Sequence, residues 1–243
     1  MDPSEYYRIQ ALAPSHWWYQ SLIRIAEHHS DTLPSHARLL DVGCGTGYLT
    51  EALVDRRVYG IDPSPTARAM WPDAGCHRVS TGSVERLPYA SETFDLVCCF
   101  DVIYHRAVED VPGALLEIQR VLKPGGRLVC QTAAFESLRN RHDDVVHTAR
   151  RLDRVHLSTL LTDAGLQIET QSYRNSFAAL PILFSRLLPT SGSNLTRLPR
   201  LIDATLRSLS HLEWSLISAG YTIPFGSSLF CVASKASLPI DAS

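Results

Sequence analysis

The most constraining feature of this sequence is a stretch in which an apolar run ends in an acid and three glycines follow at alternate positions. It spans residues 39–50 and has the sequence LLDVGCGTGYLT. This order predicts a buried parallel strand, a tight turn and a helix whose N-terminus faces a ligand. Glycine suits such a turn because it adopts positive φ angles and lets a ligand approach the backbone closely.

The spacing of these glycines differs from that of the dinucleotide-binding fingerprint. In the fingerprint the third glycine comes three residues after the second, whereas here Gly47 follows Gly45 by only two positions. The difference weakens the prediction of a nicotinamide cofactor. A second predicted strand, residues 56–62, ends in Asp62 about 20 residues after the turn, where a carboxylate accepts hydrogen bonds from ribose hydroxyls.

Three further segments follow the glycine turn in a fixed order. They are VYGIDPS at 58–64, TGSVERLPYASETFDLVCCFDVIYH at 81–105 and VLKPGGRLV at 121–129. Together with the turn, over roughly residues 36–173, they resemble the class I S-adenosylmethionine (SAM)-dependent methyltransferases. The resemblance implies an α/β, Rossmann-like, doubly wound sheet of seven strands, mostly parallel with one antiparallel strand. The alternative is a turn that only connects a strand to a helix, which the strand-end acid and the later motifs disfavour.

The resemblance implies SAM as the cofactor and assigns its binding to the glycine turn and to neighbouring strand ends. Ser83 stands where the family commonly has an aspartate that binds the adenine amino group, and its hydroxyl can accept the same hydrogen bond. Trp18 is added because an aromatic ring attracts a sulfonium cation. The predicted cofactor contacts are Asp41, Gly43, Cys44, Gly45, Asp62, Pro63, Ser83, Val84, Phe100 and Trp18.

Length and composition fit one globular domain and limit the kinds of partner that it can have. The 243 residues predict a helical cap at 1–35, a core at 36–173 and lid helices with a last strand at 174–243. The net charge of −2 argues against nucleic acid as the main substrate. No segment reaches membrane-spanning length, the N-terminus lacks the order of a secretory signal, and the six cysteines show no disulfide or metal-ligand spacing. We expect a cytoplasmic protein with a small-molecule partner and no metal, and leave a homodimer open.

Candidate catalytic residues lie past the carboxyl ends of the later strands, where open α/β sheets place their ligands. Tyr173 ends a predicted strand, and it can offer its ring to the sulfonium or its hydroxyl to the substrate. Asn140 can donate and accept hydrogen bonds at once. His105 is a candidate base because an imidazole titrates near neutral pH. Each has a structural alternative: a strand end, a helix cap and a histidine bonded to nearby backbone.

Local patterns predict several other elements. Ser15 is expected to cap a helix, residues 123–126 to turn into the fifth strand, and 226–233 to form the last strand. The resemblance implies that this last strand is inserted antiparallel between strands five and six. Residues 178–188 are apolar but too short to span a membrane, and predict a lid helix, a dimer helix or an amphipathic helix that closes the core. A charged, solvated helix face is the simplest explanation for Arg150, Arg151 and Arg154.

The expected pocket wall is aromatic and polar with few charges, which suggests a small organic acceptor such as a natural-product intermediate. Methyl transfer depends mainly on holding the nucleophile in line with the methyl carbon, and needs a base only when the nucleophile arrives protonated. The first hypothesis is therefore a small-molecule methyltransferase. The same fold is known to host a second reaction, in which the amine of SAM attacks its own γ-carbon and releases methylthioadenosine and azetidine-2-carboxylate. The third hypothesis is a non-catalytic SAM-binding protein.

Overall fold

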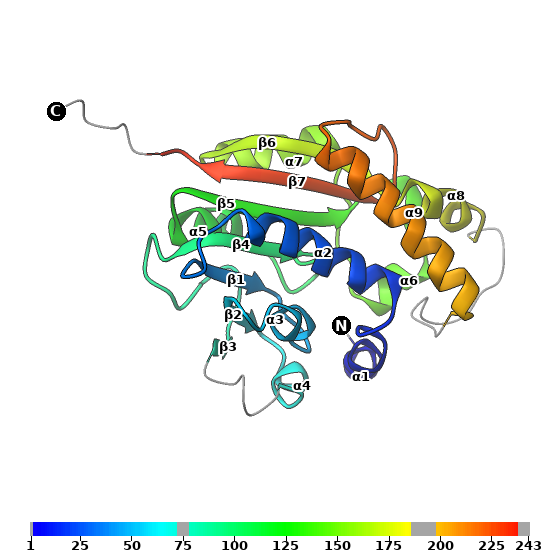
Figure 1. The fold of residues 1–243 in the computed structure, drawn as a ribbon, viewed down its shortest axis with the longest axis horizontal. Coiled ribbons are helices and arrows are strands. Elements are labelled where there is room, and N and C mark those ends of the chain that lie inside the picture. The colour runs from blue at the N-terminus through cyan, green and yellow to red at the C-terminus, as the bar shows by residue number, and fades with distance from the viewer. Residues whose placement is uncertain (1, 72–77, 186–197, 238–243) are drawn as a thin grey trace.

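The computed structural model describes residues 2–71, 78–185 and 198–237, which form a seven-stranded sheet with helices on both faces (Figure 1). The strand order is β3-β2-β1-β4-β5-β7-β6. Neighbouring strands run parallel, except that β7 pairs antiparallel with both β5 and β6. This topology confirms the predicted sheet and its antiparallel last strand. The strands are β1 (Arg38–Val42), β2 (Arg57–Asp62), β3 (Val79–Thr81), β4 (Phe94–Phe100), β5 (Leu122–Ala133), β6 (Leu166–Arg174) and β7 (Ser228–Lys235).

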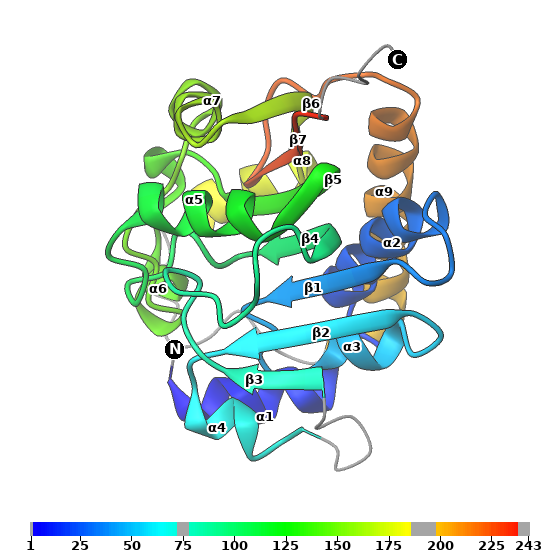
Figure 2. The ribbon, with the colours of Figure 1, turned by 90° about the vertical axis from the view of Figure 1, so that its left-hand side faces the viewer.

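Apolar side chains of the strands alternate between the two faces of the sheet. Helices cover each of these faces (Figure 2). In β4, Val97 and Cys99 belong to one apolar cluster, whereas Leu96 and Cys98 belong to the other. Because both faces are covered, β4 is apolar along nearly its whole length, as is typical of a central parallel strand. The covering helices are α5 (Val111–Val121) and α7 (Arg154–Asp163) on the first face, and α2 (Trp17–Asp31), α3 (Tyr48–Ala52) and α9 (Arg200–Ser218) on the second.

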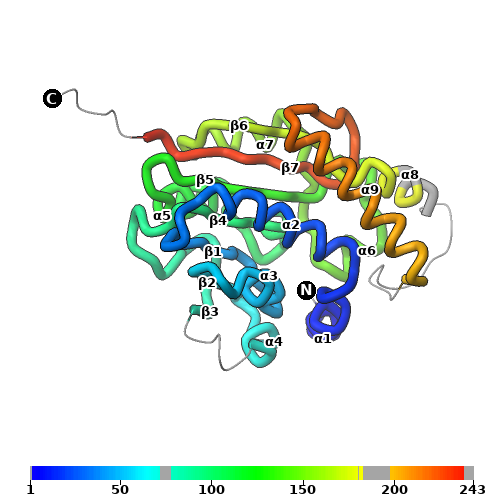
Figure 3. Tube along the Cα trace, in the orientation of Figure 1, coloured from blue at the N-terminus to red at the C-terminus, as the bar shows by residue number. Residues whose placement is uncertain are grey.

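Helices from the two ends of the chain lie side by side. α2 packs against α9 (Figure 3), and the backbone N–H of Trp17 donates a hydrogen bond of 2.9 Å to the Asp203 carboxylate. α1 (Pro3–Leu12) lies at the end of the sheet where the parallel strands finish, and it contacts α4 (Pro65–Arg68) (Figure 1). Beyond the carboxyl ends of β5 and β6 lie η2 (Glu136–Leu138), α6 (Arg141–Val145) and α8 (Ser176–Ser185).

Two local expectations differ from the structure. The N-cap of α2 is His16 and not Ser15, because a ring nitrogen of His16 accepts a hydrogen bond from the α2 backbone. β5 begins at Leu122, so residues 123–126 continue the strand, and a register shift in its pairing with β4 accommodates them. The helix expected at 178–188 is α8 in its described part, and residues 186–188 lie outside the described residues. No helix of the described ranges is both long and apolar enough to cross a membrane.

Candidate functional site

The three glycines of the turn after β1 all have positive φ angles, but they serve different purposes. The φ angle is +70° at Gly43, +52° at Gly45 and +84° at Gly47. A Cβ atom on Gly43 would lie 2.4 Å from a methyl group of Val102, so packing requires this glycine. A Cβ atom on Gly45 would meet no described atom within 4 Å. The turn is therefore open at Gly45, where a ligand can approach the backbone.

Neighbours on both sides hold the turn in place. The backbone N–H groups of Gly43 and Cys44 donate to the Ile61 carbonyl of β2 at 2.7 and 3.0 Å. On the other side, the indole N–H of Trp71 donates to the Gly45 carbonyl at 2.8 Å. The sequence analysis missed Trp71, because no local pattern links a tryptophan 26 residues away to the turn.

Two buried acids lie beside the turn. Asp62, at the end of β2, accepts hydrogen bonds of 2.9 Å from the backbone N–H groups of Gly45 and Ser64. Asp41, in β1, is 4 % exposed, and one of its carboxylate oxygens has no hydrogen-bond partner among the described residues. Burial raises the pKa of both carboxyls, and the nearby Asp62 raises the pKa of Asp41 further. The pair therefore favours a ligand that carries positive charge and hydroxyl donors.

Two predicted cofactor contacts, Ser83 and Val84, lie in the turn after β3, and a third, Pro63, follows β2. The Ser83 hydroxyl accepts a hydrogen bond from the Glu85 backbone and donates one to the Glu85 carboxylate, each at 3.2 Å. Val84 is 4 % exposed and belongs to the core. Pro63 is exposed and precedes Ser64, the N-cap of α4. The Ser83 oxygen keeps a lone pair with which it can accept a further hydrogen bond.

A third acid, Asp101, directly follows Phe100 at the end of β4 and was not among the predicted site residues. Its φ angle of +60° is strained for a residue with a side chain, and such strain is concentrated at functional sites. Its carboxylate accepts hydrogen bonds from Gln131 Nε2, at 3.4 Å, and from the side chain of Trp18. Asp101 is half-buried, and desolvation by the surrounding protein raises its pKa to about 7. Its sequence signal is an acid at a strand end, the signal that identified Asp62.

A fully buried arginine, Arg174 at the end of β6, links the sheet to α9. Its guanidinium donates to the side chain of Gln131 and lies 3.5 Å from Ser210 Oγ, while Nε has no partner among the described residues. Burial lowers the pKa of Arg174 to about 10, and Glu213 of α9 partly offsets that effect. Glu213 also accepts hydrogen bonds of 2.6 and 2.8 Å from the backbone of residues 175–176. Side chains therefore fix the chain after β6.

Two of the predicted catalytic residues have defined local partners. Tyr173 stacks on Phe135 with the ring centroids 4.6 Å apart, and its hydroxyl accepts a hydrogen bond of 3.2 Å from the Arg154 backbone. Asn140 is the N-cap of α6, and its side-chain oxygen accepts a hydrogen bond of 2.8 Å from the His142 backbone. These contacts are the structural roles that the sequence left open. The catalytic roles of both residues stay predictions.

The third candidate, His105, lies in the same loop after β4 as Asp101. Its Nδ1 atom accepts a hydrogen bond of 3.1 Å from the Ala107 backbone, and its ring centroid lies 5.7 Å from that of His147. Burial lowers the pKa of His105 to about 4, so the ring is neutral at pH 7 but is a weak base. The pKa of Asp101 is better matched to proton transfer near neutral pH.

Two of the three arginines expected on a solvated helix face, Arg150 and Arg151, instead hold the loops of this region together, whereas Arg154 is the first residue of α7. Arg151 pairs with Asp143 at 3.0 Å, and their side chains are only 7 % and 2 % exposed. Arg150 donates to the carbonyl oxygens of Ile103 and Val108 at 3.3 and 2.9 Å. The expectation was wrong because Arg150 and Arg151 lie between helices, where loop carbonyls and a buried acid need donors.

The N-terminal helix α1 lies across the ligand side of the sheet. Glu5 is 1 % exposed and Tyr6 is 7 % exposed. The Tyr6 hydroxyl hydrogen-bonds with the Ser64 side chain and lies close enough to Asp62 for that charge to raise its pKa. Glu5 lies close enough to His142 of α6 for its charge to raise the pKa of that histidine, which partly offsets the lowering by burial. The helix therefore reaches from the glycine turn to the region beyond β5.

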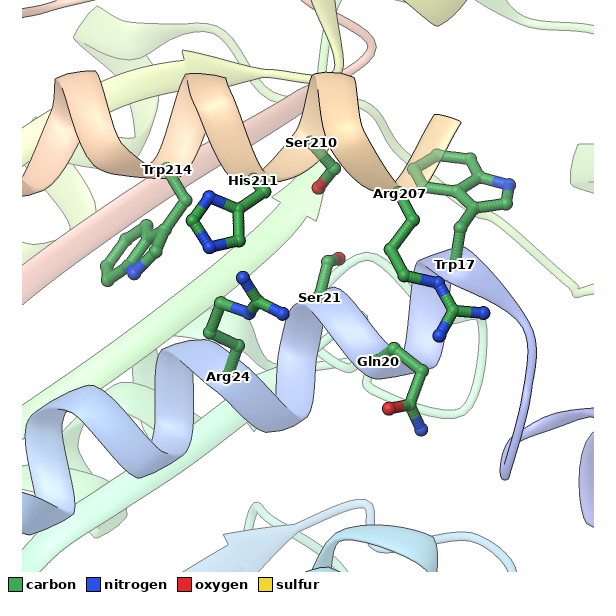
Figure 4. Close-up of a pocket in the computed structure, with 8 residues that line it drawn as sticks. All are labelled: Trp17, Gln20, Ser21, Arg24, Arg207, Ser210, His211 and Trp214. Carbon is green, nitrogen blue, oxygen red and sulfur yellow. The ribbon is translucent and has the colours of Figure 1, made fainter. Parts of the chain in front are cut away.

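A separate groove lies between α2 and α9 (Figure 4). It has room for roughly one water molecule. None of the acids and glycines described above lines it, so it is not part of this site. Its lining residues are Trp17, Gln20, Ser21, Arg24, Arg207, Ser210, His211 and Trp214.

Known proteins match the region around the turn. Residues 40–130 match a family described as "Methyltransferase domain". A malonyl-[acyl-carrier protein] O-methyltransferase from Serratia marcescens is 34% identical over 112 residues, which cover 44% of this chain and 42% of the relative. A ubiquinone biosynthesis O-methyltransferase from Idiomarina loihiensis is 31% identical over 155 residues, 54% of this chain and 61% of the relative. The chain thus spans less than two thirds of the length of either relative.

Solved structures share the fold over most of the chain. The [4+2]-cyclase SpnF superposes with a TM-score of 0.59 at 21% identity, over 91% of this chain and 83% of the cyclase. Geranyl diphosphate C-methyltransferase from Streptomyces coelicolor A3(2) superposes with a TM-score of 0.61 at 15% identity, over 90% of this chain and 76% of that enzyme. At these identities the similarity concerns the fold alone.

The residues at the turn also fit the cofactor of the family. SAM carries a sulfonium and an ammonium group, and the unpartnered oxygen of Asp41 suits a positively charged donor. The open side of Gly45 leaves the backbone accessible beside Asp62. Residues 40–130 are therefore a methyltransferase domain, the sheet has the topology of the class I SAM-dependent methyltransferases, and SAM is the cofactor of this domain.

Proposed function

We propose that this protein transfers the methyl group of SAM to a small organic acceptor of the natural-product type. The observation that carries the proposal is the position of α1, whose buried residues Glu5 and Tyr6 lie over the ligand side of the sheet. A covered site suits a small acceptor, whereas a macromolecular acceptor requires the helix to move aside. The relatives are named for a carrier-protein substrate, a tRNA and a quinone pathway, so they do not agree on the size of the acceptor. That the acceptor is small is therefore the proposal's own claim.

The proposed cofactor contacts follow from the acids beside the turn. When bound, SAM supplies a methyl carbon that its sulfonium makes electrophilic. Asp62 accepts hydrogen bonds from the ribose hydroxyls, using the carboxylate lone pairs that are not bound by the Gly45 and Ser64 amides. Asp41 accepts a hydrogen bond from the ammonium group. Trp18 offers an aromatic ring to the positive charge. These residues position the cofactor, and positioning supplies most of the catalysis in this type of reaction.

An acceptor that arrives protonated needs a group to take its proton, and we assign this role to Asp101. Its carboxylate receives the proton from the O–H or N–H group of the acceptor and later releases it to water. Gln131 and Trp18 fix the orientation of the carboxylate. Tyr173 and Asn140 remain the candidates for orienting the acceptor.

A second candidate reaction is the intramolecular cyclisation of SAM to azetidine-2-carboxylate with release of methylthioadenosine. The covering helix α1 favours it, since a site closed by Glu5 and Tyr6 can be complete with the cofactor alone. In this reaction Asp101 takes the proton from the ammonium group, so that the free amine becomes the nucleophile. The two reactions therefore use the same residues and differ in whether a second molecule is required.

Mass analysis of the products separates the two reactions. S-adenosylhomocysteine that appears only when candidate acceptors are added supports methyl transfer, whereas methylthioadenosine formed from SAM alone supports cyclisation. Asp62→Ala is the negative control for either product, because its cofactor site is damaged. If calorimetry shows SAM binding but neither product forms across a broad panel of small acceptors, both proposals are contradicted.

A further inference from the structure

Helix α9 has two apolar faces, and the described residues cover only one of them. The inner face packs against α2 and the sheet through Trp214 and Ile217, which are 6 % and 3 % exposed. Figure 4 shows Arg207, Ser210 and Trp214 projecting from this side toward α2. The other face, which we call the outer seam, carries large apolar side chains in contact with solvent.

The outer seam repeats at alternating intervals of three and four residues along the whole helix. It consists of Ile202, Thr205, Leu209, Leu212, Leu216 and, just past the helix end, Ala219. The exposed fraction is 50% for Ile202, 39% for Leu209, 59% for Leu212 and 39% for Leu216. This spacing is that of the a and d positions of a coiled coil, which keep one stripe of a helix facing a second helix. A helix that only covers a core has no need of a second apolar stripe.

None of the charged residues of α9 lies on the outer seam. Asp203 and Glu213 bind backbone groups on the inner side, and Arg207 pairs with Asp203. The positions that flank the seam include Ser208 and Ser215, which are uncharged. An uncharged seam offers no attraction to an acidic or basic partner, and it causes no repulsion between two copies of itself.

We propose that the outer seam is the interface between two copies of this chain, with their α9 helices packed antiparallel. The seam positions are distributed evenly about a point between Ser210 and His211, so a twofold axis through that point superposes the seam on itself. Such an interface is self-complementary, because the same residues serve both copies.

The antiparallel arrangement matches side-chain sizes along the seam. At the centre, Leu209 faces the partner's Leu212. Toward the ends, Leu216 faces the partner's Thr205 and Ile202 faces the partner's Ala219. Each large residue near the ends therefore meets a small one, which allows the two helices to approach closely.

The dimensions of the seam favour a second copy over a membrane surface. Leu201 is 81 % exposed and flanks the seam. With it, the apolar surface is on the order of 500 Å² per copy, and a pair buries about 1,000 Å², the minimum for a specific interface and the size of a weak, reversible one. A helix that lies in a membrane surface carries Lys and Arg beside its apolar face, whereas serines flank this one. The proposal does not depend on which reaction the protein catalyses.

Sedimentation velocity of the full chain over a wide concentration range tests the interface. We expect a dimer, and we expect Leu209→Glu and Leu212→Glu each to raise its dissociation constant about tenfold or more, because a charge is then buried at the centre. Leu116→Glu is the matched control, since Leu116 is 52 % exposed on α5 and should leave the dimer intact. Circular dichroism of each variant checks that the fold is retained.

Three outcomes of this experiment overturn the proposal. The first is a monomer at every concentration, and the second is a dimer that neither seam variant weakens. The third is a monomer that binds vesicles of phosphatidylcholine and phosphatidylglycerol and loses this binding in Leu212→Glu, which assigns the seam to a lipid surface.

Disulfide trapping tests the antiparallel direction. The five described cysteines are buried, so in a Cys76→Ser background an added cysteine reports on the seam. When Leu209→Cys and Leu212→Cys proteins are mixed and oxidised, we expect the cross-link between the two different variants to form faster than that of either variant with itself. Faster cross-linking of each variant with itself indicates parallel helices and overturns the antiparallel arrangement.

Discussion

The two halves of the ligand side of this sheet are built by different means. Around β1 and β2 the backbone provides the partners: the Gly45 and Ser64 amides bind Asp62, and the turn amides bind a β2 carbonyl. Around β5 and β6 the loops are held by their side chains, which bind one another, as in the ion pair between Arg151 and Asp143, or bind loop backbone groups, as Arg150 does. A backbone-built site depends on glycines at fixed positions, whereas a site built from side chains depends on which distant residues the fold brings together.

This difference explains why the cofactor half resembles a family and the acceptor half does not. The cofactor is the same in every member, so the same turn serves all of them. The acceptor changes, and a region held by side-chain pairs can change with it while the strands keep their positions. The four predictions below test this contrast, from the largest expected effect to the smallest.

Asp62→Ala is expected to weaken SAM binding by about 100-fold or more while the protein stays folded. Two charge-assisted hydrogen bonds to ribose are lost, each worth about 1.5–3 kcal/mol, and the Gly45 and Ser64 amides lose their acceptor. Calorimetric titration with SAM measures the effect, and Asp55→Ala, at an exposed acid near β2, is the control. Equal affinities of the two variants would remove Asp62 from the cofactor site.

Asp143→Asn is expected to destabilise the fold by about 3–5 kcal/mol, because it leaves the buried guanidinium of Arg151 without its counter-charge. Urea denaturation measures the loss, and Asp144→Asn, at the exposed neighbouring acid, is the control. Under conditions where the variant is folded, SAM affinity should stay within a few-fold of the wild type. Loss of SAM binding without loss of stability contradicts the division into two halves.

The sequence predicted the backbone-built half and most of the fold, because its information is local. An apolar run, an acid and alternating glycines define the turn without reference to the rest of the chain. Asp101 is also an acid at a strand end, but the features that distinguish it are a positive φ angle and a hydrogen bond from Gln131 on the next strand, and neither can be seen in the local sequence. Arg151 was expected on the surface, because the sequence does not reveal that folding places its side chain beside the buried Asp143.

Asp101→Asn is expected to change how stability depends on pH. The folded protein holds the Asp101 pKa near 7, whereas an unfolded aspartate titrates near 3.8. Between these values the folded state binds more protons, so Asp101 contributes stability that is fully present below the unfolded pKa and is lost as the pH rises through about 7. Melting temperatures should therefore fall less steeply with rising pH in Asp101→Asn than in the wild type.

The control for this change is Asp163→Asn, at an exposed aspartate of α7. It should leave the pH dependence of the melting temperature unchanged. Parallel curves for the wild type and Asp101→Asn would show that Asp101 does not have a raised pKa, and would remove the reason for assigning it the proton.

The smallest effects are expected at Asn140 and Tyr173, where structural and catalytic roles lead to different results. Loss of the cap in Asn140→Ala, or of the hydroxyl in Tyr173→Phe, costs about 1 kcal/mol of stability in either case. A catalytic role adds a rate lowered about tenfold or more, equivalent to about 1.4 kcal/mol, at near-normal SAM affinity. Asp153→Ala removes the N-cap of α7 and controls for cap loss alone. If both variants match this control in rate as well as in melting temperature, the acceptor does not contact these residues, and the loop after β4 with Asp101 is the better candidate.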